Sequence, residues 1–268
     1  MKGCVFFFIA TFICPKAWSL VSDEFMAMGT TWRWQATDGR KTIHKEAISR
    51  QLIKIAYKYE TTFSEWSKES EYSKLAEKGF KKPQFVSNLF IKGFCLSVEA
   101  YKRTQGAFDI SVLSKKKIKL TDFYYERGKF SIPQKEVKLT WGGIIKGMAL
   151  GQMAECLKTS GLNHFSINAG NGNSAYYGSL AESVDEIKKG QLVLLSFSKT
   201  TQKQQNQFKQ HIFNPHKRTL SFDRNEKLIC YEKENWVKAA ALSDAWSTAL
   251  TVNPKLKLPS SCRRLRIS

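Results

Sequence analysis

Hydrophobic residues recur at helical spacing in three stretches of the chain, and each stretch predicts a helix with one buried face. The first follows the Asp38-Gly39 turn, and its apolar positions are Ile48, Leu52, Ile55, Ala56 and Tyr59. The second can be capped by Ser87 and ends near Gln105-Gly106; its apolar positions are Ile91, Phe94, Cys95 and Val98. The third follows Gly147 and stops at Gly161; its apolar positions are Leu150, Met153, Ala154 and Leu157.

Other stretches predict strands and a last helix. Residues 30–36 are rich in β-branched and aromatic residues, and residues 164–167 and 192–197 are apolar runs typical of buried strands. A last helix is expected from about Asp244 to Val252, begun by Ser243 and ended by Asn253-Pro254. Because some strands follow each other directly, an α+β fold is favoured over a strict βαβ alternation. With no repeat or flexible linker in view, residues 20–268 are expected to form a single large domain of mixed sheets and helices.

The first nineteen residues have the pattern of a secretory signal peptide. A positive Met1-Lys2 start precedes an apolar run of about ten residues (5–14) and the small-x-small site Ala17-Trp18-Ser19. This run is shorter than the ~20 apolar residues that a membrane span needs. A buried N-terminal strand is the alternative. Cys14 is not expected to carry a lipid, because the residues before it are not small.

The chain is strongly basic, with 43 Lys and Arg against 23 Asp and Glu and a formal charge of +20. This excess favours anionic partners such as phosphates, nucleic acid or acidic lipid headgroups. Beyond the leader, the cysteines are Cys95, Cys156, Cys230 and Cys262, and none forms a C-x-x-C pair of the kind that binds zinc. Disulfides are possible after export and their connectivity stays open, while Cys95 and Cys156 on apolar helical faces are equally compatible with buried free thiols.

Asp244 and Thr248 are candidate metal ligands. Four residues apart on a helix, their oxygens project from the same face, one turn above the other. A carboxylate and a hydroxyl are hard oxygen donors that suit Mg²⁺. The alternative is structural: Asp244 would complement the helix dipole in a first turn, and Thr248 would bond back to a carbonyl.

Four polar turns could approach a ligand. Gly142 and Gly143, expected between a strand and a helix, let the backbone come close to a phosphate, with Lys146 beside it; a plain tight turn is the alternative. Residues 106–112 are compatible with an ordinary connection from a helix into a strand. Residues 168–173 are rich in Asn and Gly and predict turns or an anion-binding nest, and residues 211–216 predict local turn chemistry.

The order of these motifs is more specific than any one of them. Between Phe25 and about Leu250 the succession resembles the ApbE family, the FAD:protein FMN transferases. It consists of Phe25-x-x-Met28-Gly29-Thr30, Phe63-Ser64-Glu65-Trp66-Ser67 with Ser70-Glu71, Gly106-Ala107-Phe108-Asp109, Gly142-Gly143-Ile144-Ile145-Lys146-Gly147, Asn168-Ala169-Gly170-Asn171, His211-Ile212-x-x-Pro215 and Asp244-Ala245-x-Ser247-Thr248-Ala249.

The resemblance implies an ApbE-like (T-fold-like) architecture, binding of FAD and Mg²⁺, and transfer of FMN to a Thr or Ser hydroxyl of a target flavoprotein with release of AMP. Many members are exported bacterial proteins. The leader agrees with this, so we expect a periplasmic protein or one attached to the outer face of the inner membrane. No nucleic acid partner is expected, and contact with the membrane would be peripheral at most.

The family's functional positions carry over residue by residue. The resemblance implies metal ligation by the Gly143 carbonyl, Asp244 and Thr248, and leaves Asp244 or His211 as the general base. It implies contacts to the flavin nucleotide at seven positions, namely Met28, Trp66, Ala107, Phe108, Asp109, Lys146 and Ile212. Trp66 and Phe108 would offer flat apolar surface to a ring.

Several positions depart from the family's pattern. Thr140 stands in place of an Asp before the Gly-Gly turn, Asn171 in place of a second Gly and Asn214 in place of an Asp. A Ser-Gly turn is not evident in residues 196–199, and the tail after Pro254 is short. The departures leave two alternatives to the transferase: a FAD pyrophosphatase of the same fold, and a flavin-binding protein without turnover.

Overall fold

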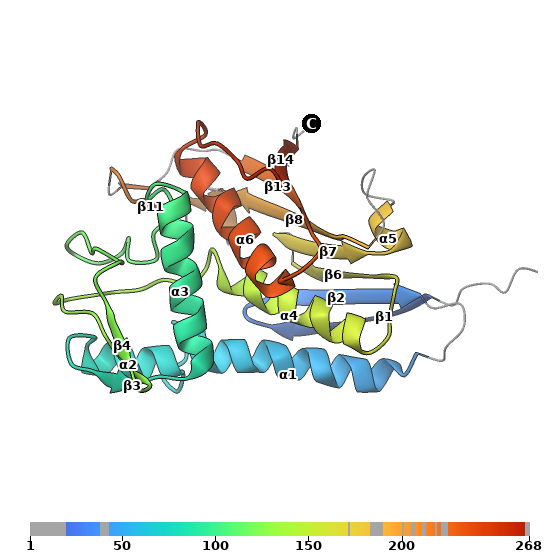
Figure 1. Cartoon of the computed structure of the whole chain (residues 1–268), viewed down its shortest axis with the longest axis horizontal. Coiled ribbons are helices and arrows are strands. Elements are labelled where there is room, and N and C mark those ends of the chain that lie inside the picture. The colour runs from blue at the N-terminus through green and yellow to red at the C-terminus, as the bar shows by residue number, and fades with distance from the viewer. Residues whose placement is uncertain are drawn as a thin grey trace, which may run out of the picture.

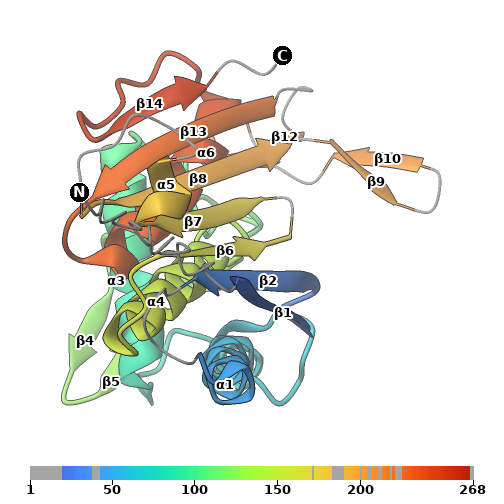
Figure 2. The same ribbon diagram turned by 90° about the vertical axis from the view of Figure 1, so that its right-hand side faces the viewer.

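Seven strands assemble into one large antiparallel sheet, whose inner strands are largely buried. In the computed structural model its order is β1-β2-β6-β7-β8-β13-β14 (Figure 2). Trp32, Trp34 and Ala36 of β2 point into the core at the spacing of two that a half-buried strand requires. The strands are β1 (Leu20–Ala27), β2 (Thr30–Thr37), β6 (Phe165–Ala169), β7 (Asn173–Tyr177), β8 (Leu192–Lys199), β13 (Asn225–Glu232) and β14 (Cys262–Leu265).

The structure describes residues 20–37, 43–170, 172–182, 190–199, 201–204, 207–210, 213–217, 219–220 and 225–265. The predicted leader, the Asp38-Gly39 turn, Asn171, His211 and Ile212 lie outside these residues.

Helices cover one face of the sheet. Helices α4 and α6 lie side by side against it, α1 runs beside β1 and α4, and α3 crosses one end of the layer (Figure 1). The apolar stripes predicted for α1, α3 and α4 are buried, apart from Cys95, which is exposed, and Ile55, which is partly buried. The helices are α1 (Lys45–Phe63), α2 (Glu71–Lys78), α3 (Asn88–Arg103), α4 (Ile145–Thr159), α5 (Ser179–Glu182) and α6 (Trp236–Val252).

Smaller elements complete the α+β fold, which confirms the predicted class. The three-stranded sheet β3-β5-β4 lies beside α2, and two hairpins, β9–β10 and β11–β12, follow β8. Aromatic rings of Phe63, Phe90, Phe130 and Trp141 pack together between α1, α3 and this small sheet. The strands are β3 (Gln84–Phe85), β4 (Tyr124–Glu126), β5 (Lys129–Ser131), β9 (Thr201–Gln204), β10 (Gln207–Gln210), β11 (Phe213–Asn214) and β12 (Thr219–Leu220).

Helix α6 begins at Trp236, well before the start predicted at Ser243. It is buried around almost its whole circumference, so its sequence lacks the polar face that marks an amphipathic helix. Asp244 therefore lies in the middle of the helix, and the alternative that it complements a dipole in a first turn is wrong. The predicted end at Asn253 is confirmed by the C-cap there.

Two predicted strands next to the polar turns are also wrong. Residues 106–112 form consecutive turns, because Asp109 Oδ1 accepts hydrogen bonds from the backbone N and the Oγ of Ser111, both at 2.7 Å. Residues 137–141, before the Gly-Gly turn, are assigned to no strand.

One disulfide joins Cys230 of β13 to Cys262 of β14, while Cys95 and Cys156 are free thiols. The disulfide closes a loop that contains the whole of α6. Burial raises the pKa of both free thiols.

Candidate functional site

A cavity of about 690 Å³ lies where the β1–β2 turn, the turns after α3, the start of α4 and the middle of α6 meet. It is lined by many of the residues that the sequence singled out: Ala107, Phe108, Asp109, Gly143, Lys146, Asp244 and Thr248. These residues come from three segments far apart in the sequence. The fold therefore brings together most of the predicted site.

Three proposed ligands meet in this cavity. Asp244 and Thr248 project one turn apart from α6, and Gly143 lies against Thr248: a Cβ built on Gly143 would lie 3.0 Å from Thr248 Oγ1 and 3.0 Å from Phe108 Cε2. Only glycine fits there without displacing a neighbour. A main-chain segment, a hydroxyl and a carboxylate thus share one corner of the cavity.

The carboxyl group of Asp244 is 5 % exposed and held by its neighbours. Gly147 N donates to Asp244 Oδ2 at 3.1 Å, and the Asn173 side chain also hydrogen-bonds to this carboxyl group. Burial raises the pKa of Asp244, against the opposing effects of the Lys146 charge and of these two hydrogen bonds. Ionising a carboxyl group that is buried in this way costs free energy unless a cation lies beside it.

Helices α4 and α6 approach unusually closely at this point. A Cβ on Gly147 would lie 2.8 Å from Asp244 Cβ, and a Cβ on Gly151 would lie 2.6 Å from Val237 Cα. Two glycines one turn apart let the backbones touch and bring Gly147 N within reach of the Asp244 carboxylate. The sequence analysis missed this contact, although Gly147-x-x-x-Gly151 is its visible signal.

Buried hydroxyl groups link α6 to β8. Ser196 Oγ lies 2.8 Å from Ser243 Oγ, and Ser198 Oγ lies 2.7 Å from Ser247 Oγ and 3.2 Å from Thr248 Oγ1. These pairs fix the rotation of α6 and so the direction of Thr248. Their signal in the sequence is a pair of serines at strand spacing and a second pair at helix spacing.

Phe108 and Asp109 line the cavity in different ways. Phe108 is 4 % exposed and packs against Gly143, and its backbone N donates to Thr104 Oγ1 at 3.0 Å. Phe108 therefore forms part of the cavity wall, and its ring presents little accessible surface to a ligand. Asp109 is half-buried and shapes the turn that carries both residues.

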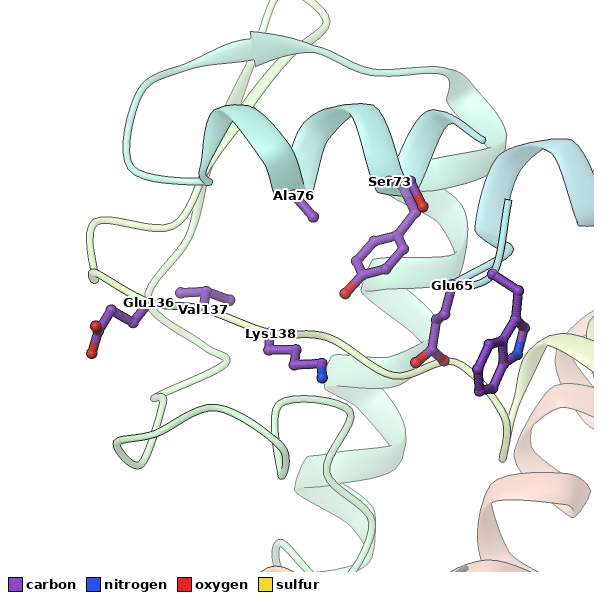
Figure 3. A pocket seen from close by; sticks show the side chains of 8 residues that line it. Glu65, Ser73, Ala76, Glu136, Val137 and Lys138 are labelled. Atoms are coloured by element: carbon purple, nitrogen blue, oxygen red, sulfur yellow. The ribbon is translucent and has the colours of Figure 1, made fainter. Parts of the chain in front are cut away.

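Other predicted contacts lie outside this cavity. Trp66 is 96 % exposed and lines a separate pocket of about 490 Å³. In that pocket Ser73 and Ala76 of α2 face the segment with Glu136, Val137 and Lys138 (Figure 3). Met28, in the β1–β2 turn with a φ of 51°, is partly buried, and its neighbour Gly29 is the one that lines the cavity. His211 and Ile212 lie outside the described residues.

Two departures from the family's pattern have local substitutes. Thr140 Oγ1 and Trp141 N both donate to Glu65 Oε1 at 2.9 Å, so a carboxylate from another segment holds the chain just before Gly142. Asn214 Oδ1 accepts from the backbone N of His216 and of Lys217, both at 3.0 Å. A neutral carbonyl oxygen performs this turn-capping role as well as a carboxylate.

The donor set around Asp244 fits a hard cation. Among the described residues no group of three or more His, Cys, Asp or Glu side chains could hold a metal ion. Asp244, Thr248 and Gly143 all line the cavity, and they would instead offer one carboxylate, one hydroxyl and one main-chain carbonyl. Such a site matches Mg²⁺, which binds through one or two carboxylates and takes its remaining ligands from water and substrate phosphates.

Comparison with known proteins shows which family model and which solved structures this chain is similar to. Residues 28–123 match the model of the ApbE family. A solved flavin transferase ApbE from Vibrio cholerae superposes with a TM-score of 0.70 at 15 % identity, over 88 % of this chain and 87 % of that one. The chain has the ApbE fold. The resemblance detected in the sequence is therefore confirmed, as is the predicted ApbE-like fold.

Further solved structures with the ApbE fold agree. The flavinyl transferase ApbE of Pseudomonas stutzeri, in its apo form, has a TM-score of 0.69 at 13 % identity and covers 87 % of this chain and 84 % of its own. The ApbE protein of Thermotoga maritima has a TM-score of 0.67 at 16 % identity, with 87 % of each chain covered. No curated protein matches the sequence.

Proposed function

We propose that the protein is a Mg²⁺-dependent FAD:protein FMN transferase, which moves FMN from FAD to a Thr or Ser hydroxyl of a target flavoprotein and releases AMP. The observation that carries this proposal is the convergence of Asp244, Thr248 and Gly143 in a cavity that also contains Lys146. The similarity to solved structures named as flavin transferases supports it.

The start of α4 is the expected binding site for the diphosphate of FAD. This helix begins at Ile145, and Lys146 lies in its first turn and lines the cavity. The N-terminal end of a helix attracts anions through its free backbone N–H groups and its dipole, and Lys146 adds a full positive charge. Ala107, Phe108 and Asp109 would contact the nucleotide from the opposite segment.

The residues in the cavity would hold the metal through oxygen atoms only. Asp244 supplies the charge, Thr248 the hydroxyl and Gly143 the main-chain carbonyl, while Gly147 N and Asn173 keep the carboxylate in place. A bound Mg²⁺ would neutralise diphosphate charge and stabilise the departing AMP.

The proposed reaction is a substitution at the FMN phosphorus. The oxygen of the acceptor hydroxyl forms a new bond to this phosphorus, and the bond from the phosphorus to the bridging oxygen breaks. AMP leaves with the bridging oxygen, and the hydroxyl gives up its proton. The candidate proton acceptors are Asp244, which lies in the cavity, and His211, which lies outside the described residues.

The test is to incubate residues 20–268 with FAD, Mg²⁺ and a target protein that carries an acceptor Thr. Covalent flavin fluorescence on the target band, together with free AMP, is the expected result. Free FMN and AMP without labelled target would instead identify a FAD pyrophosphatase. Retention of intact FAD would identify a binding protein, and either outcome would overturn the proposal.

We also propose that the protein is exported and acts in the periplasm or on the outer face of the inner membrane. The leader-like residues 1–19 and the Cys230–Cys262 disulfide support this, because disulfides persist in oxidising compartments. In the described part of the chain, no helix has the length and hydropathy of a membrane span. Fractionation of cells that express the full chain tests the proposal: recovery in the cytoplasm would contradict it.

A further inference from the structure

Asn173 is a buried amide beside the carboxyl group of Asp244. It is the first residue of β7, is 2 % exposed and lines the cavity. Its backbone is fixed from both sides, because Asn173 is opposite Ala169 of β6 and Ser196 of β8 in the sheet. The side chain is therefore presented to α6 from a rigid strand.

The two ends of this amide have different surroundings. Hydrogen bonding from the Asn173 side chain acts to lower the pKa of the Asp244 carboxyl group, against the effect of burial. Since an ionised carboxylate can only accept, the amide nitrogen faces Asp244 and the carbonyl oxygen points elsewhere. That oxygen, Asn173 Oδ1, is buried and has no hydrogen-bond partner among the described residues.

A buried carbonyl oxygen without a donor is unfavourable, and native proteins rarely keep one without a reason. Here the oxygen belongs to a residue that lines the cavity and is hydrogen-bonded to a proposed metal ligand. The donor it lacks is therefore expected to arrive with the ligand. Mg²⁺ in proteins usually keeps several of its waters, which are strong donors.

We infer that Asn173 is a positioning residue of the metal site: its amide nitrogen orients Asp244, and its carbonyl oxygen accepts a hydrogen bond from the hydration shell of the bound cation. The inference rests on the proposed function, because it assumes that Mg²⁺ binds at Asp244, Thr248 and Gly143. It assigns a role at the metal to a residue that the sequence analysis placed in a turn or an anion-binding nest.

The test compares variants by their apparent Mg²⁺ affinity, measured by calorimetry with FAD present, and by their thermal unfolding without metal. Asn173→Leu keeps the volume and removes both polar groups. It is expected to weaken Mg²⁺ binding about tenfold, the usual size of an outer-shell effect.

Ser166→Ala is the matched control, because Ser166 is a fully buried strand residue whose hydroxyl also has no partner among the described residues, yet it does not line the cavity. It should leave the Mg²⁺ affinity unchanged. FAD binding in EDTA provides a second control, and Asn173→Leu should bind FAD there as the wild type does.

Several results would overturn the inference. One is an unchanged Mg²⁺ affinity in Asn173→Leu with only lower thermal stability, which would show a purely structural role. A second is a loss of FAD binding in EDTA by Asn173→Leu that is as large as its loss of Mg²⁺ affinity. This would show that Asn173 Oδ1 contacts the nucleotide and not the hydration shell of the metal.

If Asn173→Leu does not fold, Asn173→Ser takes its place with the same expected tenfold loss, and an unchanged affinity again overturns the inference. If the wild type itself binds no Mg²⁺, the proposed function fails and not merely the role of Asn173.

Discussion

Gly143 and Asp244 show how single residues shape the cavity. Gly143 leaves space that any side chain would fill, since a Cβ there would lie 3.0 Å from both Phe108 Cε2 and Thr248 Oγ1. Asp244 is buried in the middle of α6, and Gly147 N and Asn173 hold its carboxyl group. Neither residue can change without moving or unpairing the other groups around the proposed metal.

Gly143→Ala is predicted to weaken Mg²⁺ binding by about tenfold, because the new methyl group displaces Thr248 or turns the Gly143 carbonyl away. The apparent Mg²⁺ affinity, measured by calorimetry with FAD, checks this. Gly142→Ala is the matched variant, because its Cβ would meet no atom of the described residues within 4 Å. If both variants bind Mg²⁺ equally well, Gly143 does not have the proposed role.

At the scale of elements, sequence periodicity was a good guide wherever one face of an element is exposed. The stripe of α1 and the capping of α3 by Ser87 were predicted correctly for this reason, and the stripe of α4 was found although only Thr159 of that helix is exposed. The start of α6 was not, because a helix that is buried nearly all round has no polar face to mark it. The turns at residues 106–112 were mistaken for the entry to a strand, because their apolar side chains are buried as those of a strand would be. They belong to the wall of the cavity and not to a sheet.

The candidate site was predictable only in part. Spacing alone placed Asp244 and Thr248 on one face of a helix, and the Gly-Gly turn pointed to Gly143 and Lys146 beside a phosphate. The family resemblance added the roles of Gly143 at the metal and of Lys146 at the nucleotide. The supporting contacts of Glu65, Ser198 and Asn173 come from segments distant in the sequence, so no local pattern reveals them. Trp66 was expected at the nucleotide but lines a different pocket.

The close packing of α4 on α6 has a testable consequence at Gly151. Replacing an interior helical Gly by Ala normally stabilises a helix by up to ~1 kcal/mol. Gly151→Ala is predicted to do the opposite and destabilise the protein by about 1–3 kcal/mol, because its Cβ would lie 2.6 Å from Val237 Cα. Urea unfolding measures the difference, and a gain in stability would show that the helices are not in close contact there.

At the scale of the whole molecule, the disulfide closes a loop that includes the helix lining the cavity. The Cys230–Cys262 bond ties the edge strand β14 to β13, and the loop of sequence separation 32 that it closes contains α6, the helix that carries Asp244 and Thr248. Such a cross-link stabilises a protein mainly by restricting its unfolded chain. The positive charge of +20 adds a second property of the whole molecule, since it favours the approach of anionic FAD.

Reduction of this disulfide is predicted to lower the free energy of unfolding by about 3–4 kcal/mol, as expected for a loop of this length. Unfolding of the Cys230→Ser, Cys262→Ser double variant checks this value. Alkylation of residues 20–268 after denaturation should modify only Cys95 and Cys156 unless a reductant is added first. Modification of Cys230 without a reductant would contradict the pairing.

The proposed metal site is tested most directly by Mg²⁺-dependent attachment of flavin to a target protein, compared between the wild type and Asp244→Asn. This substitution keeps the volume of the buried side chain and removes its charge, so the metal-free variant should unfold within a few degrees of the wild type. The wild type is predicted to label the target only when Mg²⁺ is present, and Asp244→Asn to label it at no Mg²⁺ concentration. Labelling by folded Asp244→Asn with the same dependence on Mg²⁺ as the wild type would contradict the metal site and the function built on it.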